Sequence, residues 1–131
     1  FKTLAGDKTP RGLAKLADRA AVQSGVAQAE VRLGAARAYA LEVLADVYVR
    51  AGPEGAIDFP DRAKTRLAAS NAIHGAIEVA DWVYKQAGVD AIFPGGPFQR
   101  RFRDIHTLSQ QIQAQSGGEA DRKSYWCRNS E

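Results

Sequence analysis

The chain has 131 residues and a formal net charge of +3, from 18 lysines and arginines and 15 aspartates and glutamates. A chain of this length suits one domain whose core needs no disulfide or metal. Its single cysteine, Cys127, cannot form an intramolecular bridge, so nothing indicates an oxidising compartment. No apolar run approaches the ~20 residues of a membrane span and no signal peptide is visible, so we expect a cytoplasmic protein.

The charge pattern argues against nucleic-acid binding. The isoelectric point of about 9.2 is high, but basic residues are interleaved with acidic ones and only Arg100, Arg101 and Arg103 cluster. We consider three functions for this chain. A nucleic-acid-binding bundle that uses these arginines and Lys123 is the weakest of them. It would show strongly salt-dependent binding.

The first segment ends at Thr9-Pro10, and proline fits the first turn of a helix that threonine caps. This pair predicts a brief helix over Arg11–Ala17. A much longer helix is predicted over Ala20–Ala51, which contains no proline and spans about 45 Å at 1.5 Å per residue. The pair Gly52-Pro53 ends it. Its apolar residues recur every three or four positions, at Val22, Val26, Ala29, Leu33, Ala36, Ala40, Leu44 and Val47.

A second long helix is predicted to start at Asp58 or Phe59, with Pro60 in its first turn, and to stop at Gly88. Its stripe is Leu67, Ser70, Ile73, Ile77, Ala80 and Tyr84. A final helix is predicted from Pro97 to about Gln115. Its apolar positions are Phe98, Phe102, Ile105, Leu108 and Ile112.

These elements predict an all-α, up-down helical bundle, four-helix-bundle-like, with three long helices and a short first one. We expect the bundle to occupy residues 1–115 and residues 116–131 to form a polar, loosely ordered tail. Helices of about 45 Å bury more surface than one small bundle supplies. A homo-oligomer, dimer or tetramer, or a neighbouring domain is therefore favoured.

The turn before the final helix is the best candidate site. Gly95-Gly96 leads directly into the helix start, and Arg100 and Arg103, three positions apart, share a face. Backbone N–H groups and two arginines suit an anion such as a diphosphate. An ordinary charged first turn is the alternative. No metal site is expected, because His106 and His74 are on different helices; we interpret His74 as a packing residue.

The segment Gly95-Gly96, followed by Gln99-Arg100-Arg101-Phe102-Arg103-Asp104, resembles the last-helix motif of the acyl-CoA dehydrogenase superfamily. It is most similar to the branch with the two-component flavin-dependent monooxygenases, the type 2 C-terminal domain. Gln23-x-x-x-Ala27-x-Ala29-Glu30 with Ala35-Ala36-Arg37 resembles the first long helix of that domain. Arg66-Leu67-Ala68 through Ala87-Gly88 resembles the second, and the similarity covers about Leu16 to Gln115.

The resemblance implies the C-terminal bundle of a flavin-dependent oxidoreductase that binds FAD or FMN and assembles into a homo-oligomer. By position, Gly95, Gly96, Arg100 and Arg103 would lie near the flavin phosphates, with Gln23 a further candidate. The chain departs from the pattern at Gln111, which stands where monooxygenase-like members often have a catalytic histidine and cannot act as a general base.

The acyl-CoA dehydrogenases use a glutamate base, and no glutamate occurs between Asp90 and Gly118. The catalytic residue is therefore unassigned, and we expect the isolated chain to be catalytically incomplete. The second hypothesis is a non-catalytic oligomerisation or interaction bundle of the same fold.

Overall fold

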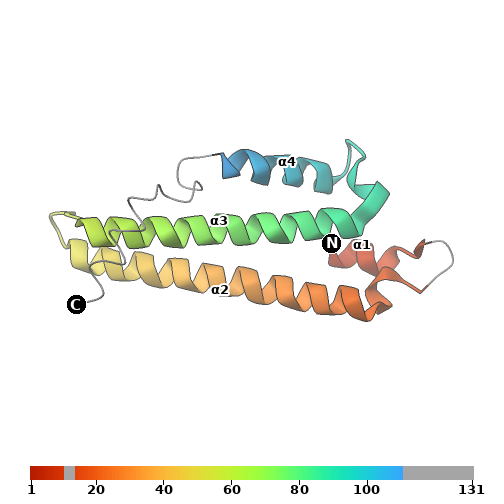
Figure 1. Ribbon diagram of the computed structural model, residues 1–131, viewed down its shortest axis with the longest axis horizontal. Coiled ribbons are helices and arrows are strands. Elements are labelled where there is room, and N and C mark those ends of the chain that lie inside the picture. Colours follow the sequence, from red (N-terminus) through yellow and green to blue (C-terminus); the bar gives the residue numbers. More distant parts are fainter. Residues whose placement is uncertain (11–13, 111–131) are drawn as a thin grey trace.

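The computed structural model describes residues 1–10 and 14–110, and these residues form helices and no strands (Figure 1). The predicted all-α fold, with three long helices and a short first one, is confirmed. The helices are α1 (Lys2–Asp7), α2 (Ala20–Ala51), α3 (Phe59–Ala87) and α4 (Pro97–Ser109), with 3₁₀ turns η2 (Leu16–Asp18) and η3 (Gly88–Ala91).

Helices α2 and α3 form a long antiparallel hairpin, and α4 returns along α3 (Figure 1). Helix α3 packs against both α2 and α4 and so lies between them. Helix α2 has the predicted bounds and ends at Gly52, whose φ of 59° is left-handed and favours glycine.

Helix α3 begins where its capping residues predict. The Asp58 carboxylate accepts a hydrogen bond of 2.8 Å from the backbone N–H of Asp61, and a proline occupies the first turn. The helix stops at Gly88, whose N–H donates to the carbonyl of Tyr84 and whose φ is 59°.

The prediction for the N-terminal segment is wrong. A helix forms over Lys2–Asp7 rather than over Arg11–Ala17, and within the latter range residues 14 and 15 are not helical. Residues 11–13 lie outside the described part. The physical reason is tertiary, because Phe1 packs edge-to-face on Trp82 of α3 with 5.4 Å between ring centroids. The local sequence around Thr9-Pro10 does not indicate this contact.

Helix α4 starts at Pro97 as predicted and ends at Ser109, six residues before the expected Gln115. Residues 111–115 of that prediction, and the predicted tail over 116–131, lie outside the described residues. The face of α4 toward α3 carries Phe102, whose ring centroid is 4.3 Å from that of Tyr84.

The buried residues gather at the two ends of the hairpin rather than along its whole length. One cluster consists of Ala5, Leu16 and Val22, and the other of Val43, Val47 and Ala68. Between them the predicted α2 stripe is only partly covered: Ala36 is buried, but Leu33 is 42% exposed. Near the C-terminal end of α2, Leu44 is 52% exposed, because its neighbour Val43 is the residue that faces α3. The middle of the hairpin is therefore open.

Candidate functional site

The turn before α4 brings Gly95 and Gly96 to the start of the helix, as the sequence predicts. Gly96 is the residue preceding the first helical position, and no side chain caps α4. Its own N–H donates to the carbonyl of Phe93 at 3.0 Å, so that donor is already used. The uncapped N–H groups of the next turn are the ones that can donate hydrogen bonds to an anion from solvent.

The two glycines differ in the space around them. A Cβ atom at Gly95 would meet no atom within 4 Å, whereas one at Gly96 would lie 3.4 Å from the Phe93 carbonyl oxygen. Gly96 therefore permits the tight approach of two backbone segments, and Gly95 leaves an open approach from solvent.

Arg100 and Arg103 are both exposed on α4. The Arg100 guanidinium lies 3.6 Å from the Asp104 carboxylate, one turn later, and both side chains are more than 65% exposed. An ion pair this exposed is weak, so Arg100 can exchange Asp104 for a phosphate at little cost. The first turn of α4 contains no acidic residue. These features fit a phosphate group.

Gln23 is not brought to this turn by a shared helix. It lies on α2, and its side-chain amide donates a hydrogen bond of 3.0 Å to the carbonyl of Ala17. That bond ties the start of α2 to the preceding 3₁₀ turn. A flavin contact from Gln23 stays a prediction.

A polar and aromatic cluster that the sequence did not predict joins α3 to α4. The His106 ring nitrogen Nε2 lies 2.8 Å from the Asp81 carboxylate, and both side chains are about two-fifths exposed. The His106 ring also packs against Phe102, with centroids 4.4 Å apart. The helical period placed His106 on the face of Phe102, but no sequence signal paired it with Asp81, which lies 25 positions away.

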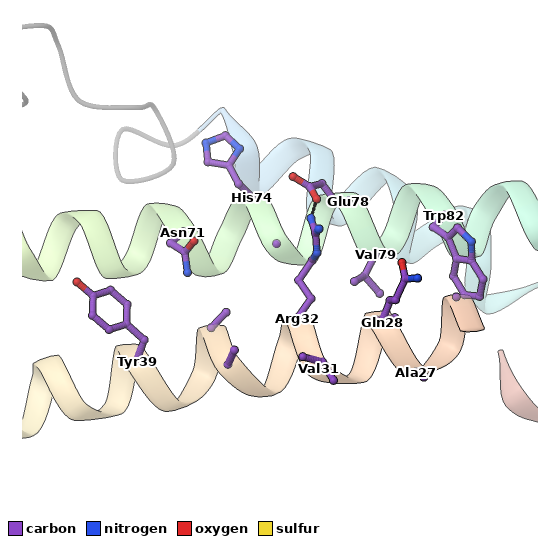
Figure 2. Close-up of a pocket in the computed structure, with 15 residues that line it drawn as sticks. Ala27, Gln28, Val31, Arg32, Tyr39, Asn71, His74, Glu78, Val79 and Trp82 are labelled. Carbon is purple, nitrogen blue, oxygen red and sulfur yellow. Dashed lines mark ion pairs between the residues drawn. The ribbon is translucent and has the colours of Figure 1, made fainter. Parts of the chain in front are cut away.

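A groove of about 950 Å³ opens between α2 and α3 in the uncovered middle of the hairpin (Figure 2). Arg32 reaches from α2 to form an ion pair with Glu78 of α3 across it. Trp82 closes one end, where its indole lies against Gly25, and Tyr39 lies toward the other. None of the five predicted cofactor residues lines this groove.

His74 also lines the groove and is exposed, and its interpretation as a packing histidine stays a prediction. The residue lies on the middle part of α3 (Figure 2). Its position depends on where α2 and α3 separate, which the local sequence does not encode.

Two charged contacts shift pKa values. Hydrogen bonding to Lys2, followed by the charge of that lysine, lowers the pKa of Glu30 below 4.5. Hydrogen bonds from Arg50 lower the pKa of Asp61 below 3.8, and in turn raise the pKa of Arg50. Both contacts join separate helices and are structural.

Among the described residues, His, Cys, Asp and Glu side chains do not gather in groups of three that could hold a metal ion. In the same part of the chain, each helix is either too short or too polar to cross a membrane.

Comparison with known proteins identifies one family. The sequence model described as Acyl-CoA dehydrogenase, C-terminal domain, matches residues 2–116 of the chain. A comparison with curated proteins gave no match. The family match spans all four helices, and it includes the Gly95-Gly96 turn and the first arginines of α4.

Proposed function

The chain belongs to the family of acyl-CoA dehydrogenase C-terminal domains, and we propose on that premise that it is the C-terminal bundle of a flavin-dependent oxidoreductase. In this proposal the start of α4 binds the phosphate of FAD or FMN, and the long helices supply an oligomer interface. The location is cytoplasmic. The remaining parts of the flavin site come from other domains or another subunit.

The observation that carries the proposal is the uncapped, acid-free start of α4 with two exposed arginines on one face. Free N–H groups in the first turn donate hydrogen bonds to phosphate oxygens, and the helix dipole favours the negative charge. Arg100 and Arg103 add charge-assisted hydrogen bonds. Gly95 leaves room for the phosphate to approach the backbone.

The chain's own residues bind and orient in this proposal, and none of them is assigned as the acid or base. A bound flavin would supply the redox chemistry of the reaction. Holding its phosphate fixes the position of the ring relative to the rest of the enzyme. The residue that moves the substrate proton stays unassigned, and Gln111 lies outside the described residues.

The test is a fluorescence titration of the 131-residue chain with FMN, FAD and riboflavin, which lacks the phosphate. We expect FMN and FAD to bind more tightly than riboflavin. Arg100→Ala and Arg103→Ala should each weaken FMN binding ~10- to 100-fold, because each removes a charge-assisted hydrogen bond. Arg101→Ala is the matched control, since it removes an equally exposed arginine that is not assigned to the site. Equal affinity for riboflavin and FMN would contradict the phosphate site.

The second candidate is an assembly bundle of the same fold that holds no cofactor. The exposure of large apolar side chains on α2, such as Tyr48 at 83%, favours it. It predicts a stable oligomer with no flavin binding even when the remaining domains of the enzyme are supplied. The titration, repeated with those domains present, separates the two candidates.

A further inference from the structure

Lys8 joins the N-terminal segment to the turn in front of α4. Its ammonium donates a hydrogen bond of 2.6 Å to the carbonyl of Ala87, the last residue of α3, and forms an ion pair with Asp90 in η3. The last carbonyls of a helix have no partner within the helix, and the helix dipole places negative charge there, so a lysine side chain suits this position. Lys8 therefore binds α3 and η3 at once.

The Lys8 contact is partly shielded from solvent, and the backbone that carries it is fixed. The side chain of Lys8 is only 21% exposed, whereas that of Lys2, in the same segment, is 70% exposed in its ion pair with Glu30. The backbone N–H of Lys8 donates to the carbonyl of Leu4, and its carbonyl accepts from the N–H of the buried Leu16. A partly buried pair on a fixed backbone loses less to solvent screening and side-chain entropy than an exposed pair.

Asp90 connects this contact to the Gly95-Gly96 turn. A Cβ atom at Gly96 would lie 3.6 Å from the carbonyl oxygen of Asp90 and 3.4 Å from that of Phe93, so the backbone of η3 lies against the residue that precedes α4. The Gly96 N–H donates to the Phe93 carbonyl at 3.0 Å. The η3 turn packs against both α3 and α4. A displacement of η3 would therefore displace the start of α4.

We propose that Lys8 is a positioning residue for the phosphate site at the start of α4. Through Asp90 it holds the η3 turn, and with it the uncapped N–H groups of α4, in the arrangement that receives a phosphate. Lys8 itself is assigned no contact with the phosphate, since its ammonium binds Ala87 and Asp90. Groups that are held in place before a ligand arrives bind it more tightly, because less conformational freedom is lost. This inference rests on the proposed function.

The opposite charges of Lys8 and Asp90 separate positioning from simple electrostatics. Lys8→Met removes a positive charge and Asp90→Asn removes a negative one. An effect of charge alone would therefore weaken the binding of an anion in the first variant and strengthen it in the second. Positioning predicts a loss in both variants, because either substitution breaks the same contact. The two losses should not add, because the second substitution has no contact left to break.

Fluorescence titration of the full chain with FMN and riboflavin tests the effect on binding. Lys8→Met and Asp90→Asn should each weaken FMN binding ~10-fold, the double variant no further, and riboflavin binding should not change. Lys2→Met is the matched control, because it removes an equal charge from the same segment at an exposed pair, and it should change FMN binding less than ~2-fold. Unchanged FMN affinity in Lys8→Met, or tighter FMN binding in Asp90→Asn, would overturn the inference.

Amide hydrogen exchange followed by NMR tests the turn itself, without flavin. The Gly96 N–H, which donates to Phe93, should exchange ~10-fold faster in Lys8→Met and in Asp90→Asn, because the turn opens more often. Its exchange should stay at the wild-type rate in Lys2→Met. Unchanged exchange of Gly96 in Lys8→Met would overturn the inference even if FMN binding fell, since the loss of binding would not come from the turn.

Failure of this inference is distinguishable from failure of the proposed function. A wild-type chain that binds FMN no more tightly than riboflavin overturns the phosphate site and the role of Lys8 together. Equal FMN affinity in the wild type and in Lys8→Met overturns only the role of Lys8 and leaves the phosphate site standing.

Discussion

Gly25 is the residue of α2 against which the Trp82 indole of α3 packs. A Cβ atom built there would lie 2.2 Å from Cζ2 of Trp82 and 2.6 Å from Cε2, both in a rigid ring. The absence of a side chain lets the indole lie against the backbone of α2. Trp82 in turn receives Phe1, so one glycine supports the contact between α3 and the N-terminal segment.

We predict that Gly25→Ala destabilises the chain by about 1–3 kcal/mol, because the added methyl group must displace the indole. Urea unfolding followed by circular dichroism measures the change. The matched control is Gly75→Ala, also inside a long helix, where a Cβ atom would meet Arg32 at an ordinary 3.6 Å. That variant should gain ~0.5–1 kcal/mol from helix propensity. A similar gain at Gly25 would contradict the packing of Trp82.

At the scale of elements, the α2–α3 turn is held by the ion pair between Arg50 and Asp61. The Arg50 Nε donates to both Asp61 oxygens, at 3.1 and 2.9 Å, and the terminal nitrogen donates as well. Asp61 also lies in the first turn of α3, where the helix dipole favours a negative charge. Its side chain is only 14% exposed, which limits screening by solvent.

This ion pair makes part of the stability depend on pH. Hydrogen bonds from Arg50 lower the pKa of Asp61 in the folded chain below its ordinary value of 3.8. The stabilisation is therefore complete above pH 3.8 and is lost as the pH falls through the lowered pKa.

We expect Asp61→Asn to be less stable than the wild type near neutral pH, and the difference to shrink as the pH falls below 3.8. Urea unfolding over a pH series measures it. Glu54→Gln, which neutralises an exposed acid in the same turn, is the control and should show little difference at any pH. A difference for Asp61→Asn that stays constant to low pH would contradict the role of the ionised pair.

At the scale of the whole molecule, the helices are arranged so that α4 depends on α3. Helix α4 packs against α3 and the η3 turn, and α2 packs on α3 separately. The main side-chain contacts of α4 are Phe102 with Tyr84 and His106 with Asp81. None of its residues is fully buried. The hairpin can therefore stay folded when α4 detaches.

We predict that Phe102→Ala accelerates hydrogen exchange of α4 about 10- to 100-fold and leaves exchange in α2 and α3 nearly unchanged. The reason is that the substitution removes the aromatic contact between α3 and α4 without touching the hairpin core. Arg101→Ala, the exposed neighbour, is the control and should alter neither region. Equal acceleration in all three helices would show that the chain unfolds as one unit.

The local sequence determined the long helices closely. The end of α2 at Gly52, the start of α3 at Asp58-Phe59 and the start of α4 at Pro97 follow from a glycine, a cap and prolines that act within one turn. The position of Gly95-Gly96 before a helix was also predicted from the sequence, because Pro97 marks the helix start that follows. Such features need no knowledge of the rest of the chain.

Contacts between distant residues required the tertiary structure. The packing of Phe1 on Trp82 moved the first helix to Lys2–Asp7, and the pairing of Asp81 with His106 joined positions 25 apart. The periodicity of α2 indicated which of its apolar residues share a face. Only the packing of α3 showed which of these residues are covered and which are exposed. Helical periodicity determines which residues share a face, whereas the partner of each face depends on the free energy of the whole assembly.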